Sequence, residues 1–242
     1  MHEKINKNNS MKLSIIIPIF NEKKTIIKLL QIIEEQKFIK KQIIIVDDCS
    51  TDNSLDLVKS YDFKDENLIL SHKINEGKGA SIQSAQKHIN GDYVIIQDAD
   101  LEYDPNDYKF LLDPIINGTS EVVYGSRVLN KKRYKNNFIS NYRILGNHLL
   151  TLFSNLINNQ NLSDAHSCYK VFKADFFKNI KLTHNDFSFC PEITTKISNL
   201  KKNIIEVPIS YRGRSVDEGK KITLKDAFLA IYTLIKFKYF IR

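Results

Sequence analysis

Apolar residues along the first hundred positions fall into short blocks that have the lengths of strands and helices. Continuous apolar runs rich in β-branched residues, which are typical of buried strands, occupy residues 13–17, 43–46, 68–70 and 93–97. The first run is followed by Pro18, which we expect to end the strand. Between the runs, apolar residues such as Ile26, Leu30 and Ile33 recur at helical spacing. This alternation of strand and helix predicts right-handed crossovers and a mainly parallel sheet flanked by helices.

The second half of the chain is less regular. Strands are predicted at residues 121–124, 169–172 and 204–207, and leucines at helical spacing predict an amphipathic helix through residues 145–156.

The last segment can be interpreted in two ways. A helix over residues 224–242 has Leu224, Phe228, Ile231 and Ile235 on one face and several basic residues elsewhere. Such a helix either packs against the core or lies on a membrane surface. We therefore divide the chain into a flexible tail (1–10), one α/β domain (11–223) and a C-terminal amphipathic helix (224–242).

Composition limits the protein class. With 242 residues, 42% of them hydrophobic and 26% charged, the chain fits one large soluble domain. No apolar run approaches the roughly 20 residues that span a bilayer, and the first ten residues lack the apolar core of a secretory signal. Three widely spaced cysteines (Cys49, Cys168 and Cys190) indicate a reducing, cytoplasmic setting. The net charge of +8 indicates an anionic partner such as a nucleotide or a phospholipid surface.

Polar side chains follow three of the predicted strands at the points where the strands end. In open parallel sheets, ligands bind at the carboxyl ends of the strands, so these residues are expected to share one site. They are Asn21 and Glu22, Asp47 and Asp48, and Asp98 and Asp100.

Asp98 and Asp100 follow the strand at residues 93–97. In an extended backbone, side chains two positions apart point to the same face, so the two carboxylates are expected to lie side by side. Such a pair is costly unless a positive charge lies between them. A hard divalent cation that also takes oxygens from a substrate phosphate suits this need. An acidic turn without a metal is the alternative interpretation.

Several common phosphate sites are excluded. The segment Pro18 to Glu22 lacks the Gly-x-Gly-x-x-Gly of a dinucleotide site, and Gly77-Lys78-Gly79 lacks the spacing of a P-loop. A phosphatase with an aspartyl nucleophile usually has a hydroxyl residue where this chain has Leu101-Glu102. A metal-assisted transfer from a nucleotide-diphosphate donor remains, with the acids at the first two strand ends binding base and ribose.

The order of these motifs resembles that of glycosyltransferase family 2, whose fold is GT-A. The similar segments are Ser14-Ile-Ile-Ile-Pro-Ile-Phe-Asn-Glu22, Ile45-Val-Asp-Asp-Cys-Ser-Thr-Asp52, Asn75-Glu-Gly-Lys-Gly-Ala80 and Gln97-Asp-Ala-Asp-Leu-Glu102. Further segments resemble the polyprenyl-phosphate sugar transferases, the group of dolichyl-phosphate mannose synthase and undecaprenyl-phosphate glucosyltransferase. They are Gly125-Ser-Arg127, Leu162 to Lys170, Phe189 to Ile193, Glu206 to Tyr211 and Glu218 to Ile222.

The resemblance implies three groups of site residues. The nucleotide-sugar site would be Pro18, Asn21, Glu22, Asp47, Asp48, Lys78 and Asp98. The metal, Mg²⁺ or Mn²⁺, would be held by Asp98, Asp100 and Glu102. The acceptor phosphate would be bound by Arg127, Arg143, Arg214 and Lys221, since guanidinium groups pair with phosphate through two parallel hydrogen bonds. Asp98, Asp100, Arg127 and Arg143 would form the catalytic set.

The function implied is an inverting hexosyl transfer from UDP-glucose or GDP-mannose to a polyprenyl phosphate. Because a phosphate acceptor is already anionic, positioning and charge neutralisation can replace a general base. The enzyme would be cytoplasmic and peripheral at the inner face of the cell membrane, through the lipid surface itself or a membrane partner protein.

Two alternatives remain. A soluble family 2 enzyme of cell-envelope polysaccharide synthesis would use a hydroxyl acceptor and need a base, for which Asp164 and Glu192 are candidates. A non-catalytic nucleotide-sugar-binding module is disfavoured by the carboxylates at three strand ends. Nucleic-acid binding fits the net charge but no motif in the chain.

Overall fold

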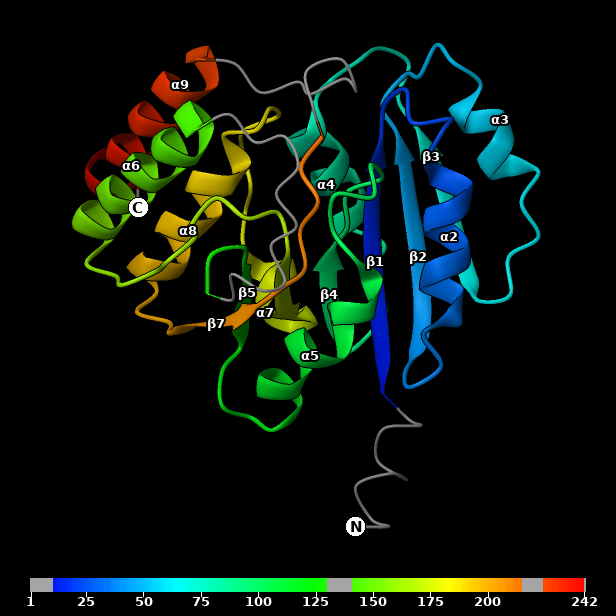
Figure 1. Cartoon of the computed structure of the whole chain (residues 1–242), viewed down its shortest axis with the longest axis horizontal. Helices are drawn as coiled ribbons and strands as arrows, with labels where there is room; N and C mark the ends of the chain where they lie inside the picture. Colours follow the sequence, from blue (N-terminus) through cyan, green and yellow to red (C-terminus); the bar gives the residue numbers. More distant parts are fainter. Residues whose placement is uncertain (1–10, 130–140, 215–223, 242) are drawn as a thin grey trace.

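A single mixed sheet forms the centre of the molecule (Figure 1). The computed structural model describes residues 11–129, 141–214 and 224–241, except for the side chains of 141–144 and 224–226. Seven strands follow in the order β3-β2-β1-β4-β6-β5-β7. β6 runs antiparallel to β4 and β5, and the other pairs are parallel, which confirms the predicted sheet. The strands are β1 (Lys12–Ile19), β2 (Lys40–Asp47), β3 (Glu66–Ser71), β4 (Tyr93–Ile96), β5 (Val122–Ser126), β6 (Lys170–Lys173) and β7 (Ile204–Pro208).

Both faces of the central strands are buried, which explains their continuous apolar runs. Side chains alternate between the faces along each strand. In β1, Ile15 and Ile17 pack into one apolar cluster while Ile16 packs into the other, and all three are fully buried. Helices cover both faces, so the domain has three layers.

The helices divide between these two clusters. α2 (Ile26–Glu35), α3 (Ser54–Lys59) and α5 (Tyr108–Ile116) contribute their buried side chains to the cluster of Ile15 and Ile17. α4 (Lys78–Gln86), α7 (Ala174–Asn179) and α8 (Phe189–Asn199) contribute to the cluster of Ile16. A short 3-10 helix, η1 (Pro105–Asp107), precedes α5.

Two further helices lie outside this sandwich. α6 (Asn141–Asn158) and α9 (Leu224–Ile235) contact each other and α8, and they sit together at one side of the molecule (Figure 1). A π-helical turn, η2 (Lys236–Phe240), follows α9. No helix among the described residues is both long and apolar enough to cross a membrane.

The buried face of α9 differs from the predicted one. Ala230 and Leu234 are buried, and Phe237 of the following turn is buried with them, whereas Phe228 is 74% exposed. The helix therefore packs on the protein and also presents apolar side chains to solvent. The two interpretations of this segment are not exclusive.

The expectation that Pro18 ends the first strand is wrong, because β1 continues to Ile19. β4 pairs with β1 only as far as Ile16, whereas β2 pairs with β1 through Pro18 and Ile19. The Ile16 carbonyl accepts a hydrogen bond from the Gln97 amide, which lies on the β4 side. Backbone groups two residues apart in a strand face the same side, so the ring nitrogen of Pro18 also faces the β4 side, at a point beyond the β4 pairing. The missing N–H of proline therefore breaks no ladder bond.

A buried hydrogen-bond network anchors the end of β4. Gln97, which follows the strand, is fully buried, and its Oε1 accepts hydrogen bonds from the hydroxyls of Tyr108 (2.7 Å) and Tyr169 (2.6 Å). Its Nε2 donates to the carbonyl oxygen of Asp98 at 2.8 Å. Both tyrosines are fully buried as well. Gln97 thus connects α5 and β6 to the acidic turn after β4.

This network predicts a large stability effect. Gln97→Leu leaves two buried hydroxyls without their acceptor, and each such loss costs about 1–3 kcal/mol. We expect urea denaturation to show a free energy of unfolding lower by about 2–6 kcal/mol. Tyr108→Phe is the control, because it keeps the Tyr169 bond and should cost about 1 kcal/mol. Equal stability of Gln97→Leu and the wild type would contradict the network's role.

Candidate active site

A pocket of about 420 Å³ opens where β1, β2 and β4 end. Its walls come from distant parts of the chain, including α4, the segment after β4, and α6 and α9. Nine of the predicted site residues line it: Pro18, Glu22, Asp48, Lys78, Asp98, Asp100, Glu102, Arg127 and Arg214. Arg143 lies in α6, but its side chain is outside the described part of the structure, and so is Lys221.

The acidic residues after β4 lie in a turn. The expectation that Asp98 and Asp100 extend a strand is wrong, because β4 ends at Ile96. Leu101 has φ 59°, a left-handed conformation that is uncommon for a non-glycine residue. The turn brings the amide of Glu102 to Asp100 Oδ1 at 3.0 Å. The carboxylates are gathered by this backbone reversal rather than by strand pleating.

Negative charge is concentrated in this turn. Burial, followed by the charges of Asp98 and Glu102, raises the pKa of Asp100 to about 7, although Arg214 acts in the opposite direction. A carboxyl group with so high a pKa reports charge repulsion and desolvation that neighbouring groups only partly offset.

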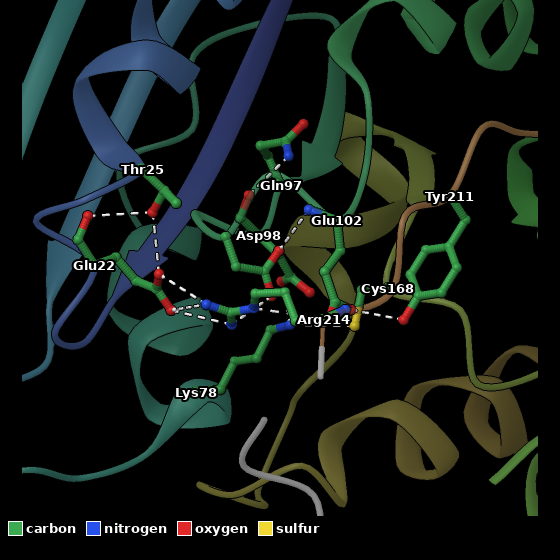
Figure 2. A network of polar contacts seen from close by, with 10 residues as sticks. Glu22, Thr25, Lys78, Gln97, Asp98, Glu102, Cys168, Tyr211 and Arg214 are labelled. Carbon is green, nitrogen blue, oxygen red and sulfur yellow. Dashed lines mark hydrogen bonds and ion pairs between the residues drawn. The ribbon is translucent and has the colours of Figure 1, made fainter. Parts of the chain in front are cut away.

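Arg214 lies across the acidic residues (Figure 2). Its Nη2 donates to Asp100 Oδ2 at 2.9 Å, and Nη1 donates to Glu22 Oε2 at 3.2 Å. Its Nε is 3.7 Å from Glu102 Oε1. These contacts span more than a hundred residues of sequence, so no local pattern could have assigned Arg214 to them.

Tyr211 and the backbone of Arg214 orient Glu102. The Tyr211 hydroxyl donates to Glu102 Oε2 at 2.6 Å, and the Arg214 amide donates to Oε1 at 2.8 Å. The guanidinium carbon of Arg127 lies 5.1 Å from the centre of the Tyr211 ring. Sequence analysis did not single out Tyr211, although it ends the segment Glu206 to Tyr211. Its ring connects the predicted metal and acceptor groups.

Lys78 forms an ion pair with Asp98 and donates to Cys168 Sγ at 3.2 Å. Burial disfavours the charged form of Lys78, but the contacts with Asp98 and Cys168 together outweigh burial, so the pKa of Lys78 is raised. Burial, and then the charge of Asp98, raises the pKa of Cys168 to about 12, so the thiol stays protonated near neutral pH. Sequence analysis did not assign Cys168 to the site.

Close packing places Lys78 at the first turn of α4. A Cβ on Gly79 would lie 2.2 Å from the carbonyl oxygen of His184, so only glycine fits there. Gly77 has φ 101°, which also favours glycine. The carboxylate of Asp48 accepts the amides of Glu76 and Gly77, each at 2.8 Å. Asp48 therefore both lines the pocket and holds the loop that begins α4.

Two predicted nucleotide residues lie elsewhere. Asn21 and Asp47 are not among the described residues that line the pocket. Asn21 Oδ1 accepts the Thr51 amide at 2.8 Å, and Asp47 Oδ2 accepts the Ser50 amide at 3.1 Å. Both side chains shape the loop after β2.

Asp164 fixes Arg127 on the other side of the pocket. Asp164 Oδ2 accepts from Arg127 Nε and Oδ1 from Nη2, both at 2.7 Å. The amides of Ser163 and Asp164 donate to Glu206 at 2.6 and 2.9 Å, so β7 holds the loop in place. Burial disfavours the charged forms of both groups, but their ion pair and hydrogen bonds, together with neighbouring groups, outweigh burial. The pKa of Arg127 is therefore raised and the pKa of Asp164 is lowered.

The two candidate general bases are engaged in structural contacts. Asp164 is paired with Arg127. Glu192 is fully buried, accepts the amides of Thr183 and His184, and forms an ion pair with Lys196. Neither carboxylate is among the described residues that line the pocket.

The chemistry of the acidic residues fits a hard divalent cation. Four carboxylates line this part of the pocket, and two cationic groups, Lys78 and Arg214, lie against them. Carboxylate oxygens are the ligands that Mg²⁺ and Mn²⁺ prefer. Within the described residues, no ready-made group of three ligands is present. The four are Glu22, Asp98, Asp100 and Glu102.

Comparison with known proteins gives relatives over nearly the whole chain. A dolichyl-phosphate beta-glucosyltransferase of Trichomonas vaginalis is 28% identical over 96% of this chain and 75% of its own length. A UDP-N-acetylglucosamine–dolichyl-phosphate N-acetylglucosaminyltransferase of Methanococcus voltae is 28% identical over 93% of this chain and 95% of its own. A dolichol-phosphate mannosyltransferase of Pyrococcus furiosus is 25% identical over 94% of this chain and 65% of its own length.

The fold also has solved counterparts. Glucosyl-3-phosphoglycerate synthase of Mycobacterium tuberculosis superposes with a TM-score of 0.74 at 16% identity, covering 98% of this chain and 84% of the other. That enzyme has been crystallised with Mn²⁺ and UDP and with Mg²⁺ and UDP. The model of the family "Glycosyl transferase family 2" matches residues 14–181, well over half of the chain. The protein is therefore a glycosyltransferase of the GT-A fold, and it belongs to glycosyl transferase family 2.

Proposed function

We propose that this enzyme transfers a hexose from a nucleoside-diphosphate sugar to a polyprenyl phosphate with inversion at the anomeric carbon. One observation carries the proposal: a single pocket contains an acidic side, with Asp98, Asp100 and Glu102, and a partly buried arginine, Arg127, that Asp164 holds in place. Such a pair of opposite charges suits a donor bound with a metal and an acceptor that is an anion. The relatives named for dolichyl-phosphate transfer support the same acceptor.

The donor belongs at the ends of β1, β2 and β4. Pro18, Glu22 and Asp48 line this part of the pocket and would contact the nucleoside, while Lys78 would lie beside the diphosphate. Asp98, Asp100 and Glu102 would hold Mg²⁺ or Mn²⁺. The cation would neutralise the nucleoside diphosphate as it leaves. The donor would be UDP-glucose or GDP-mannose.

The acceptor phosphate belongs against Arg127. Asp164 takes two of the five N–H groups of the guanidinium, so three are not engaged by this partner. The Asp164 contacts hold the guanidinium in one orientation before any ligand arrives, which lowers the entropic cost of binding. We assign Arg143 and Lys221 to the same phosphate from the motif alone, since both lie outside what the structure describes.

An anionic acceptor also accounts for the chemistry without a base. A phosphate monoester presents a charged oxygen near neutral pH, so orientation and charge neutralisation suffice. A hydroxyl acceptor would need a base, and both Asp164 and Glu192 are committed to other contacts.

A membrane surface is the partner that the outer helices suit. Leu145, Leu149, Leu152 and Leu156 form a stripe along α6 and are 51–79% exposed. On the neighbouring α9, Phe228 and Tyr232 are 74% and 58% exposed, and Lys236 lies over the Tyr232 ring. Apolar, aromatic and lysine side chains together are typical of a helix face at a bilayer interface.

The pocket and this helix face share the same two helices. Asn147 and Leu150 of α6, and Ala227 and Ala230 of α9, line the pocket. A polyprenyl phosphate that binds through its headgroup would thus have its hydrocarbon beside the bilayer. We place the enzyme at the inner face of the cell membrane. We also expect the basic segment with Lys131, Lys132, Arg133 and Lys135 to contact the membrane, and it lies outside the described residues.

The first test is a transfer assay. The protein, with Mg²⁺ or Mn²⁺, is given labelled UDP-glucose, GDP-mannose or another nucleotide sugar, with and without a short polyprenyl phosphate. We expect label in the organic phase only when the lipid is present. Label that moves only into a water-soluble saccharide would establish a hydroxyl acceptor instead.

Asp100→Asn tests the acidic side of the pocket. Removing this carboxylate weakens the neutralisation of the leaving diphosphate, so we expect kcat to fall by about 100-fold or more. Asp113→Asn, at an exposed position on α5, should keep wild-type kcat. Full metal-dependent activity of Asp100→Asn would contradict the mechanism.

Arg127→Lys tests the acceptor site. The substitution keeps the charge but loses the planar fork and its contacts with Asp164, so KM for the polyprenyl phosphate should rise by about tenfold or more. KM for the donor should stay unchanged. Arg212→Lys, at an exposed position in the same region, is the control. A rise in donor KM alone would assign Arg127 to the donor.

Vesicle sedimentation tests the membrane face. Leu149→Glu combined with Leu156→Glu should lower binding to anionic phospholipid vesicles by about tenfold or more, because each leucine would bury apolar area in the lipid. The control is Ile74→Glu, which changes a side chain that is 67% exposed in the loop before α4. An equal loss of vesicle binding in both variants would show that the added negative charge, rather than this helix face, controls binding.

A further inference from the structure

The guanidinium of Arg214 lies against the carboxylates that we assign to a divalent cation. It contacts carboxylates from two separate segments of the chain. One is Glu22 after β1 (Figure 2), and the other is Asp100 after β4. Its Nε adds a longer approach to Glu102. A single positive group thus bridges the residues that we assign to the metal and to the donor.

Both oxygens of Asp100 are already engaged. Oδ1 accepts the Glu102 amide at 3.0 Å, and Oδ2 accepts Arg214 Nη2 at 2.9 Å. Oδ1 holds the turn, whereas Oδ2 has a side-chain partner that a metal could replace. A cation bound there would meet the positive guanidinium at the same atom, and like charges at such a distance repel strongly in a buried site.

The contacts of Arg214 are weaker than those of Arg127. Its bonds to Glu22 are 3.2–3.3 Å long, beyond the usual range for charge-assisted hydrogen bonds. Its Nε is buried and has no hydrogen-bond partner among the described residues. The side chain remains 19% exposed. By contrast, both hydrogen bonds from the Arg127 guanidinium to Asp164 are 2.7 Å long, and one of them uses Nε.

We propose that Arg214 is the resident counter-ion of the carboxylate site, and that a divalent cation binds by displacing its guanidinium from Asp100. The inference rests on the proposed function for the identity of the metal site. It changes the part that the motif implies for Arg214, because the side chain would reach a phosphate only after the metal has released it. Arg214 would then exchange a carboxylate partner for a phosphate partner.

The exchange couples metal binding to phosphate binding. A ligand that binds the displaced guanidinium removes the competitor of the metal, and the metal in turn frees the guanidinium for the ligand. By linkage, each raises the affinity of the other by the same factor. The metal and the acceptor phosphate would therefore bind cooperatively, and Arg214 would carry part of that coupling.

Mn²⁺ binding without nucleotide or lipid tests the proposal. We would titrate the full chain with Mn²⁺ and follow the free ion by electron paramagnetic resonance. Arg214→Gln removes the competing charge and should bind Mn²⁺ about tenfold more tightly than the wild type. Without metal, the variant should also melt at a lower temperature, and Mn²⁺ should raise its melting temperature more than it raises that of the wild type.

Two further variants keep the result interpretable. Arg212→Gln removes an exposed arginine two residues away and should leave Mn²⁺ affinity unchanged. Arg214→Lys, which keeps a charge but not the fork, should give an intermediate affinity and serves if Arg214→Gln does not fold. Mn²⁺ affinity in the Arg214 variants that equals or falls below that of the wild type would overturn the proposal.

Failure here and failure of the proposed function are separate results. Unchanged Mn²⁺ affinity in the Arg214 variants, with lipid-dependent transfer by the wild type, would reject only the counter-ion. Tighter Mn²⁺ binding by the variants, without transfer to a polyprenyl phosphate, would keep the counter-ion and reject the acceptor.

Discussion

The crowding of carboxylates after β4 is the constraint around which the site is built. Asp98, Asp100 and Glu102 lie within one turn, and Glu22 approaches them from β1. Unpaired, these groups would repel one another at a cost that a marginally stable fold could not carry. The chain supplies Lys78 from α4 and Arg214 from beyond β7 as partners. The positive charges that offset this repulsion therefore come from segments that are far apart in sequence.

Other carboxylates in the same region shape loops. Asp48 holds the start of α4, Glu206 holds the loop that carries Asp164, and Glu192 holds the loop against which Gly79 packs. Each accepts two backbone amides, which satisfies donors that no strand or helix would satisfy. An acidic residue near the site thus either lines the pocket or holds the backbone of a loop that forms the site. Asp48 does both.

The outer helices connect the chemistry to the surroundings of the molecule. α6 and α9 turn some side chains toward the pocket and expose others, such as Leu149 and Phe228, to solvent. A GT-A sheet alone would offer a nucleotide site at its edge, as in many transferases. The two added helices give this one an apolar wall and an apolar outer face, and both suit a lipid substrate.

The sequence by itself determined the sheet, since apolar runs with β-branched residues and the helical spacing between them depend only on local pattern. It also located the carboxylates at the strand ends, because parallel topology brings those ends together. The predictions that Pro18 ends the first strand and that Asp98 lies in an extended strand were wrong, because both outcomes depend on how far β4 extends. Only the tertiary structure decided that Arg214 lies on Asp100, that Tyr211 orients Glu102 and that the α6 leucines face outward. These contacts join residues far apart in the chain, or depend on which helix face finds a partner, and neither is written in local periodicity.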